Sequence, residues 1–294
     1  MSEPLVSVVI PTLGRASLRD AIASARRQDT PTEVIVVNDS GAPLAAGLVA
    51  DGVRVLETEG RTGAAHARNL GMRAAGGDLV AFLDDDDVWL PGHLARAVAE
   101  LTAAPDADLY SCRGLVVYGP QRSRLEPVEL VGDRTLAEYF FGRDVWLSRC
   151  RRVMTPTLVF RRSLADLPMD TGLRQSEDTW WLLTAERERG ARLVQSANVG
   201  VVVHASPDRE SGRRRDDVAW ARRLESLVPG AGPAHLAAGR ARDAWRAGDP
   251  GEVARLGRAA LGFRGGWRWA APVGVQVLAA AAVRARRLIG RKRR

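Results

Sequence analysis

The 294-residue sequence has little of several features that would define its class at once. It contains only two cysteines, Cys112 and Cys150, which lie far apart. Two isolated cysteines provide neither a disulfide framework nor a zinc-cluster pattern, which suits a reducing cytoplasm. The N-terminal residues lack the charged segment and apolar stretch of a secretion signal. No run reaches the ~18 apolar residues of a membrane span. We therefore expect a globular cytoplasmic protein.

Common catalytic motifs are absent as well. The sequence has no Gly-x-x-x-x-Gly-Lys-Ser/Thr loop, no Gly-x-Ser-x-Gly elbow and no His-Glu-x-x-His motif. These absences argue against a P-loop nucleotidase, an α/β-hydrolase and a zinc peptidase.

Positive charge is concentrated at one end of the chain. The net charge is +8, and Lys292 is the only lysine. Residues 284–294 hold seven basic residues and no acid, so the rest of the chain has a net charge of +1. A nearly neutral body argues against a nucleic-acid-binding face. The basic residues of this tail are Arg284, Arg286, Arg287, Arg291, Lys292, Arg293 and Arg294.

Short apolar runs alternate with helical patterns up to about residue 205. Strand-like runs occupy 5–10, 33–37, 53–56, 79–83, 108–118, 157–162 and 199–203. Helical patterns lie at 18–28, from 60 to 75, at 91–101 and from 176 onwards. This alternation predicts an α/β fold with parallel strands and right-handed crossovers.

Four consecutive acids follow one of these strands. The run 79–83 leads directly into Asp84, Asp85, Asp86 and Asp87. Adjacent carboxylates repel one another and are tolerated only in water or around a cation. A solvated acidic loop is the simplest interpretation. Because ligands bind at the carboxyl ends of strands in open α/β sheets, we favour a metal and ligand site.

Polar residues stand at the ends of other strands too, namely Thr12, Asp39 and His204. In a parallel sheet these ends converge with the acidic run on one crevice. Asp-x-Asp carboxylates with a histidine suit Mg²⁺ or Mn²⁺, and such an ion can neutralise a diphosphate leaving group. Asp39 and His204 could instead have structural roles.

Four stretches in this order resemble the family 2 glycosyltransferases. They are 6–12, 33–39, the segment from Ala67-Arg68-Asn69-Leu70-Gly71 to 82–87, and Glu177-Asp178; Gln28 also fits. The resemblance covers about residues 5–205. It implies the GT-A (Rossmann-like) fold, an α/β class with a mixed, mostly parallel sheet flanked by helices, here followed by an α-helical C-terminal extension.

The resemblance also implies how a nucleotide-diphospho-sugar would be bound. Pro11, Thr12 and Asp39 would contact the nucleoside, with Asp39 at the base. Arg61 or Arg68 would help to bind the nucleotide, and the sequence does not choose between them.

The acidic run would hold the diphosphate side of the donor. Asp84 and Asp85 would lie at the ribose or phosphates, and Asp86 would bind Mn²⁺ or Mg²⁺. Four adjacent acids leave the register ambiguous by one residue, so Asp84 is an alternative metal ligand. His204 matches a position where some relatives supply another ligand, and a structural role is equally open.

Glu177-Asp178 would supply the general base. Asp178 is preferred, with Glu177 as the alternative, and it would take the proton of the acceptor hydroxyl. One base and in-line attack imply inversion. Two acids in the first helical turn after an N-cap Ser176 would also have a structural explanation. Trp180 or Trp181 would flank the acceptor sugar, or belong to the core.

The chain after residue 208 lies outside the resemblance. We expect a glycosyltransferase domain at 1–208, a helical extension at 209–266 and a basic amphipathic C-terminal helix and tail at 267–294. Trp267 and Trp269 precede that helix, a pattern typical of membrane-surface helices. A helix packed on its own domain is the alternative.

The expected function is metal-dependent hexosyl transfer from a nucleotide sugar, with UDP favoured. The acceptor would be a glycan, a lipid-linked saccharide or a cell-envelope saccharide, in the cytoplasm or at the inner face of the plasma membrane. A sugar-phosphate nucleotidyltransferase would need a triphosphate loop, which 11–15 does not resemble. An inactive GT-A scaffold at the membrane is disfavoured by the intact acids.

Overall fold

The computed structural model describes residues 3–119, 121–142, 151–173, 176–205, 217–241, 244–245, 249–270, 272–274 and 276–277. Cys150 and the basic tail at 284–294 lie outside these ranges. The chain forms two compact units, Met1–Asp133 with Arg149–Arg213, and Arg134–Ser148 with Arg214–Arg294. The predicted domain boundaries at 208 and 266 stay predictions.

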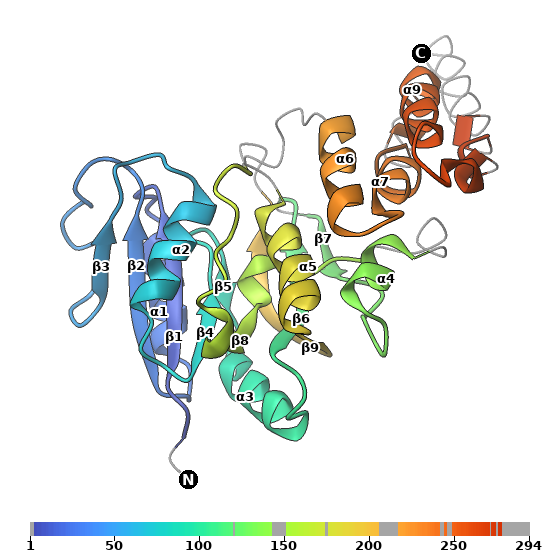
Figure 1. Cartoon of the computed structure of the whole chain (residues 1–294). Helices are drawn as coiled ribbons and strands as arrows, with labels where there is room; N and C mark the ends of the chain where they lie inside the picture. The colour runs from blue at the N-terminus through green and yellow to red at the C-terminus, as the bar shows by residue number, and fades with distance from the viewer. Residues whose placement is uncertain are drawn as a thin grey trace. The chain divides into compact units, whose positions relative to one another are not determined.

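The first unit is built on a single sheet (Figure 1). Among the described residues, nine strands join in the order β3-β2-β1-β4-β8-β6-β9-β5, with β7 beside β6. The half made of β1 to β4 is parallel, as the sequence predicts. These strands are β1 (Val6–Thr12), β2 (Thr32–Asn38), β3 (Arg54–Glu57) and β4 (Leu79–Phe82).

The other half of the sheet is mixed. β8 (Val159–Arg161) is antiparallel to both β4 and β6 (Leu109–Val117), so β6 runs in the same direction as β4. β9 (Leu193–His204) is parallel to β6. The carboxyl ends of β1, β2, β4 and β9 therefore lie at the same edge. The predicted mixed, mostly parallel sheet is confirmed.

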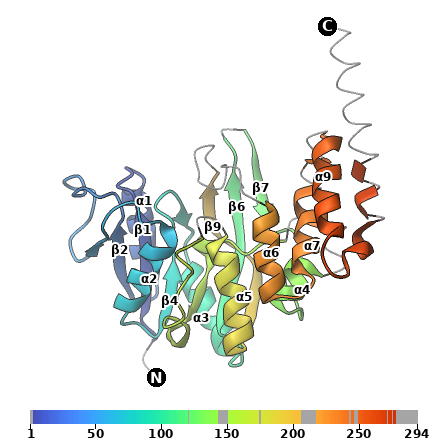
Figure 2. The same ribbon diagram turned by 45° about the horizontal axis from the view of Figure 1, so that its top comes forward.

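Two strands were not predicted. β7 (Ser123–Glu126) pairs with the end of β6, and Figure 2 shows the two side by side. β5 (Val88–Trp89) follows the acidic run and pairs antiparallel with β9. A two-residue strand is too short to display the alternation from which strands are predicted.

Helices cover both faces of the sheet, close to the predicted segments. They are α1 (Leu18–Arg26), α2 (Ala64–Ala74), α3 (His93–Ala103) and α5 (Glu177–Arg189). α1 and α3 share a core with Val8 and Ile10 of β1. Val9, on the opposite face, lies against Gly71 of α2, because successive strand side chains point to opposite sides. Figure 1 shows α2 and α5 on the side of the sheet turned to the reader.

The second unit is helical. It contains α4 (Leu136–Phe141), α6 (Asp217–Leu227), α7 (Ala231–Ala234), the π-helical η4 (His235–Arg240), α9 (Pro250–Leu261) and the 3-10 turn η5 (Gly266–Trp269). Its core joins Ala221, Leu236, Val253, Leu256 and Trp269. No helix within the described part of the chain is long and apolar enough to cross a membrane.

Candidate active site

The four acids after β4 have different environments, although their sequence is uniform. The chain turns here, and the Asp87 N–H donates to the Asp84 carbonyl at 3.1 Å. Asp84 and Asp86 are half-buried, whereas Asp85 and Asp87 are buried. The turn therefore divides the run between different partners.

Asp85 binds Thr12, the last residue of β1, and Arg15 in the loop that follows. Its Oδ2 accepts a hydrogen bond of 2.6 Å from the Thr12 hydroxyl, and its Oδ1 pairs with the Arg15 guanidinium at 2.6 Å. Burial raises the pKa of Asp85, against the lowering effect of Thr12 and Arg15. The predicted donor-binding residues Thr12 and Asp85 are thus hydrogen-bonded to each other, and Arg15, which no sequence pattern indicates, pairs with the same carboxylate.

Asp84, Asp86 and Asp87 form a group that could hold a metal ion. Each offers a carboxylate oxygen, and these oxygens lie within 4.8 Å of one another. Three hard oxygen ligands suit Mn²⁺ or Mg²⁺. The residues present therefore fit the expected cofactor. Asp84 and Asp86 are the metal ligands predicted from the sequence, and Asp87 is an addition from the structure.

His204 lies beside this group because β5 pairs with the end of β9. Its backbone N–H donates to Asp87 Oδ1 at 2.9 Å, and its ring Nδ1 lies 2.8 Å from the Asp86 carbonyl oxygen. Since a carbonyl only accepts, Nδ1 carries a proton, and the neutral ring keeps its lone pair on Nε2. The side chain is exposed. Its ring nitrogens are not among the atoms gathered within 4.8 Å.

Arg68, on α2, joins the acidic run to the start of α5. One of its terminal nitrogens pairs with Asp84 at 2.7 Å and the other with Glu177 at 2.9 Å. Burial alone would lower the pKa of Arg68, but the carboxylates of Asp84 and Glu177 raise it above its ordinary value. A permanently charged guanidinium therefore lies between the two predicted acidic sites. Arg61, the alternative nucleotide-binding residue, is exposed in the loop before α2.

Glu177 and Asp178 begin α5. Burial, followed by the charge of Asp178, raises the pKa of Glu177. Asp178 Oδ2 accepts from the Thr155 hydroxyl at 2.8 Å, and Oδ1 accepts from the Thr179 N–H at 2.6 Å. The carboxylate of the predicted base is thus oriented from two sides. No sequence pattern had pointed to Thr155.

Ser176 occupies the N-cap position, but its side chain makes no capping hydrogen bond with α5. Its φ is 59°, in the left-handed region. Among the described non-glycine residues only Arg61, with φ 52°, shares this conformation. Such backbone costs of order 1 kcal/mol or more and clusters at functional sites. Both residues lie next to segments predicted to bind substrate.

Asp39 follows β2 and organises the loop before α2. It accepts hydrogen bonds from the Thr58 hydroxyl, from the Thr62 hydroxyl and N–H, and from the Gly63 N–H. Burial would raise the pKa of Asp39, but these donors lower it below its ordinary value. Pro11 lies in the β1–β2 register opposite Val37. The nucleoside contacts of Asp39 and Pro11 stay predictions.

The two tryptophans of α5 differ. Trp181 is fully buried, packs on Phe82 and Phe160, and donates its indole N–H to the Leu167 carbonyl. Trp180 is half-buried. Trp181 therefore belongs to the core.

Comparison with curated proteins gives partial relatives. EpsJ of Bacillus subtilis, an uncharacterised glycosyltransferase, is 27% identical over 215 residues, which is 68% of this chain and 61% of EpsJ. The succinoglycan biosynthesis protein ExoO of Rhizobium meliloti is 36% identical over 197 residues, 63% of this chain and 56% of ExoO. The uncharacterised glycosyltransferase YwdF of Bacillus subtilis is 35% identical over 115 residues, 36% of this chain and 43% of YwdF. The chain thus spans about half the length of these relatives.

Solved structures share the fold at low identity. Staphylococcus aureus TarS 1–349 in complex with UDP-GlcNAc superposes with a TM-score of 0.66 at 17% identity, covering 95% of this chain and 91% of that one. The mannosyltransferase PcManGT of Pyrobaculum calidifontis, in complex with GDP-Man and Mn²⁺, gives 0.51 at 20% identity, covering 96% and 87%.

The profile of the Glycosyl transferase family 2 matches residues 7–166, more than half of the chain. The matched segment includes β1, β2, α2 and the whole acidic run, which carry most of the site described above. The chain belongs to glycosyl transferase family 2.

Proposed function

We propose that this chain is a metal-dependent, inverting glycosyltransferase that transfers a hexose from a nucleotide-diphospho-sugar to a hydroxyl acceptor. One observation carries the proposal. Arg68 joins Asp84, within the metal-suited acidic group, to Glu177 at the start of α5, next to Asp178. A group suited to the donor and a group suited to the acceptor are thereby held in one network.

For the donor, we propose a nucleoside diphosphate sugar, with UDP favoured. TarS has been solved with UDP-GlcNAc, and a relative from Escherichia coli is named a UDP-Glc:alpha-D-GlcNAc-diphosphoundecaprenol beta-1,3-glucosyltransferase. That relative is 29% identical over 105 residues. The nucleoside would lie near Asp39 and Thr12, at the carboxyl ends of β2 and β1, with Pro11 and Arg61 close by.

Asp86, with Asp84 and Asp87, would hold Mn²⁺ or Mg²⁺, and His204 Nε2 is a further candidate ligand. The Mn²⁺ complex of PcManGT supports this assignment. When bound, such an ion neutralises the charge that develops on the departing diphosphate. Arg68 pairs with Asp84, one of the proposed metal ligands, so a positive charge of the protein would also lie near the diphosphate.

For the base, we propose Asp178. Its carboxylate would accept the proton of the acceptor hydroxyl while that oxygen attacks the sugar carbon from the side opposite the diphosphate. Thr155 holds one of its oxygens and orients the group. Glu177 is a poorer candidate since its carboxylate is already paired with Arg68. Attack from the opposite side inverts the anomeric centre, so an α-linked donor would give a β-linkage.

We further propose that the acceptor is a cell-envelope saccharide and that the chain works on the inner face of the plasma membrane. The relatives named for succinoglycan and for a diphosphoundecaprenol acceptor support this class. The basic segment 284–294 supports an anionic surface as partner.

The direct test measures donor hydrolysis and transfer in the presence of Mn²⁺. We expect Asp178→Asn to lower transfer by about 10²- to 10⁴-fold, the usual contribution of a general base. Asp86→Ala should remove the response to Mn²⁺. Asp51→Asn and Asp51→Ala are matched controls at an exposed position. Transfer at the wild-type level by the Asp178→Asn protein would refute the base, and an unchanged Mn²⁺ response in Asp86→Ala would refute the metal site.

A further inference from the structure

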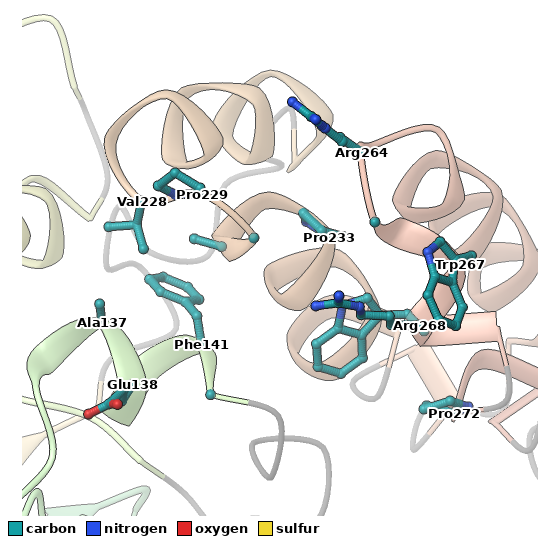
Figure 3. Close-up of a pocket in the computed structure, with 15 residues that line it drawn as sticks. Ala137, Glu138, Phe141, Val228, Pro229, Pro233, Arg264, Trp267, Arg268 and Pro272 are labelled. Carbon is teal, nitrogen blue, oxygen red and sulfur yellow. The ribbon is translucent and has the colours of Figure 1, made fainter.

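The helical unit contains a cavity of about 780 Å³ that the catalytic proposal does not use. Figure 3 shows its walls. α4 contributes Ala137 and Phe141 on one side, and the turn after α6 contributes Val228 and Pro229. Residues between 264 and 269, together with Pro272, form the other side. All lining residues belong to the same compact unit.

The lining is mostly apolar. Apart from Glu138, Arg264 and Arg268, every lining residue is Ala, Gly, Val, Pro, Phe or Trp. Glu138 is engaged in the capping box of α4, where it accepts from the Thr135 N–H at 3.0 Å. The charged lining residues that remain to bind a ligand are therefore the two arginines, Arg264 and Arg268.

This composition distinguishes between two classes of ligand. A saccharide carries a hydroxyl on most ring carbons and loses affinity where these groups find no partner. A hydrocarbon chain needs only apolar surface, which gains about 25 cal/mol per Å² on leaving water. The cavity suits a hydrocarbon chain with an anion at one end.

The anion would be held at the segment that closes the cavity. Arg264 and Arg268 are both exposed, and neither forms an ion pair with a described residue. The Arg268 guanidinium lies 5.7 Å from the centre of the Trp267 ring. Trp267 is 71% exposed and Leu261, nearby in the chain, is 44% exposed. Exposed tryptophan beside arginine is typical of surfaces that lie at the lipid head groups.

We propose that this cavity binds one anionic phospholipid of a bilayer. The apolar lining takes the part of an acyl chain nearest the head group, and Arg268 pairs with its phosphate. Arg264, whose guanidinium lies apart from that of Arg268 in Figure 3, meets the anionic head groups around this lipid. This inference rests on the proposed location of the chain at a membrane, and it deepens that proposal by naming the contact. It is independent of the proposed catalytic residues.

The test compares binding of the full chain to vesicles of phosphatidylcholine alone and vesicles that also contain phosphatidylglycerol. Each arginine near an anionic surface contributes roughly fivefold, so Arg264→Gln with Arg268→Gln should weaken binding about 25-fold. The matched control is Arg222→Gln with Arg258→Gln, which removes the same charge from exposed helical positions of the same unit outside the cavity. An equal loss in the control pair would overturn the proposal.

A second measurement separates the cavity from the surface around it. Ala137→Trp adds bulk to the wall without changing the charge, and it should weaken vesicle binding as well. A short-chain phosphatidylglycerol should raise the melting temperature of the wild-type protein, whereas glycerol phosphate should not. Full vesicle binding by Ala137→Trp together with no shift from the short-chain lipid would refute the cavity as the site.

Failure of this inference is distinguishable from failure of the proposals on which it rests. If the wild-type chain binds neither vesicle, the membrane location fails and the inference fails with it. If the wild-type chain binds anionic vesicles and the cavity variants bind equally well, only the inference fails. Donor hydrolysis without vesicles reports the catalytic site separately in every variant.

Discussion

Arg68 shows how one buried residue determines the arrangement of the candidate site. Arg68 is only 4% exposed, yet its guanidinium contacts two carboxylates that are 93 residues apart in the chain, those of Asp84 and Glu177. A buried charge is stable only with such partners, and losing one partner is costly because the other is left uncompensated. The sequence offered Arg61 and Arg68 as alternative nucleotide-binding residues. In the structure Arg68 contacts the predicted metal and base segments, and its role in nucleotide binding stays a prediction.

Asp39 supports a prediction about pH. Because its pKa is lowered in the folded chain, the ionised form stabilises the fold above the unfolded pKa of about 3.9, and this contribution is lost as pH falls through the lower folded pKa. Asp39→Asn keeps the shape but places an amide where the Gly63 N–H needs an acceptor.

We expect Asp39→Asn to lower the free energy of unfolding by about 1–3 kcal/mol near neutral pH, the usual cost of an unsatisfied buried donor. The difference from wild type should shrink as the pH falls below the ordinary aspartate range. Denaturant titrations across this pH range measure it, with Asp51→Asn as the exposed control. A difference that stays constant with pH would show that the charge of Asp39 contributes nothing.

At the scale of elements, the strands predicted from long apolar runs are confirmed, because such runs are buried on both faces. The sequence could therefore place Thr12, Asp39 and the acidic run at strand ends. It could not reveal that Asp85 and Asp87 bind different partners, since these contacts depend on a tight turn and on the pairing of β5. The partner of β5 is Val201-Val202, more than 110 residues away, and no local pattern encodes such a pairing.

Two neighbouring residues of α2, Arg68 and Asn69, also contact residues that are distant in the sequence. Asn69 donates to the Met169 carbonyl at 2.8 Å and accepts from the Met169 N–H at 2.7 Å, next to Arg68 with its bond to Glu177. In the sequence, the motif Ala67-Arg68-Asn69 carries only a family resemblance. The structure supplies a physical reason for it, because these side chains attach the segment before α5 to the helix.

α2 can approach the sheet only because position 71 is glycine. A Cβ built there would lie 2.2 Å from Val9 Cγ1, far below contact distance. Gly71→Ala would gain about 1 kcal/mol of helix propensity but must displace Val9, which typically costs 1–3 kcal/mol or more. We expect a net loss of stability, measured by denaturant unfolding. Gly274→Ala is the matched control, since its added Cβ meets no atom within 4 Å, and it should not destabilise. A stabilised Gly71→Ala protein would contradict the close packing.

At the scale of the whole molecule, the two compact units divide the chain differently from the predicted domains. Residues 134–148, which include α4, group with the C-terminal helices, although they lie inside the predicted first domain. The aromatic residues of this stretch predict that it is buried in a hydrophobic core, but they do not indicate in which of the two units. Phe141 packs against the helical core. Hydrophobicity reports that a residue is buried, and the contact that buries it depends on the fold.

The donor proposal predicts a change in the stability of the whole chain. A ligand that binds only the folded state adds about 2.7 kcal/mol at a hundred times its dissociation constant, which raises the melting temperature of a chain of this size by roughly 5–10 °C. In a panel of nucleotide sugars, we expect UDP-sugars with Mn²⁺ to give the largest shift and a chelator to reduce it. The Asp86→Ala protein should lose the Mn²⁺-dependent part of this rise in melting temperature, while the Asp51→Ala protein should keep it. Equal shifts for UDP-sugars with and without Mn²⁺ would mean that the acidic group binds the donor, if at all, without an ion.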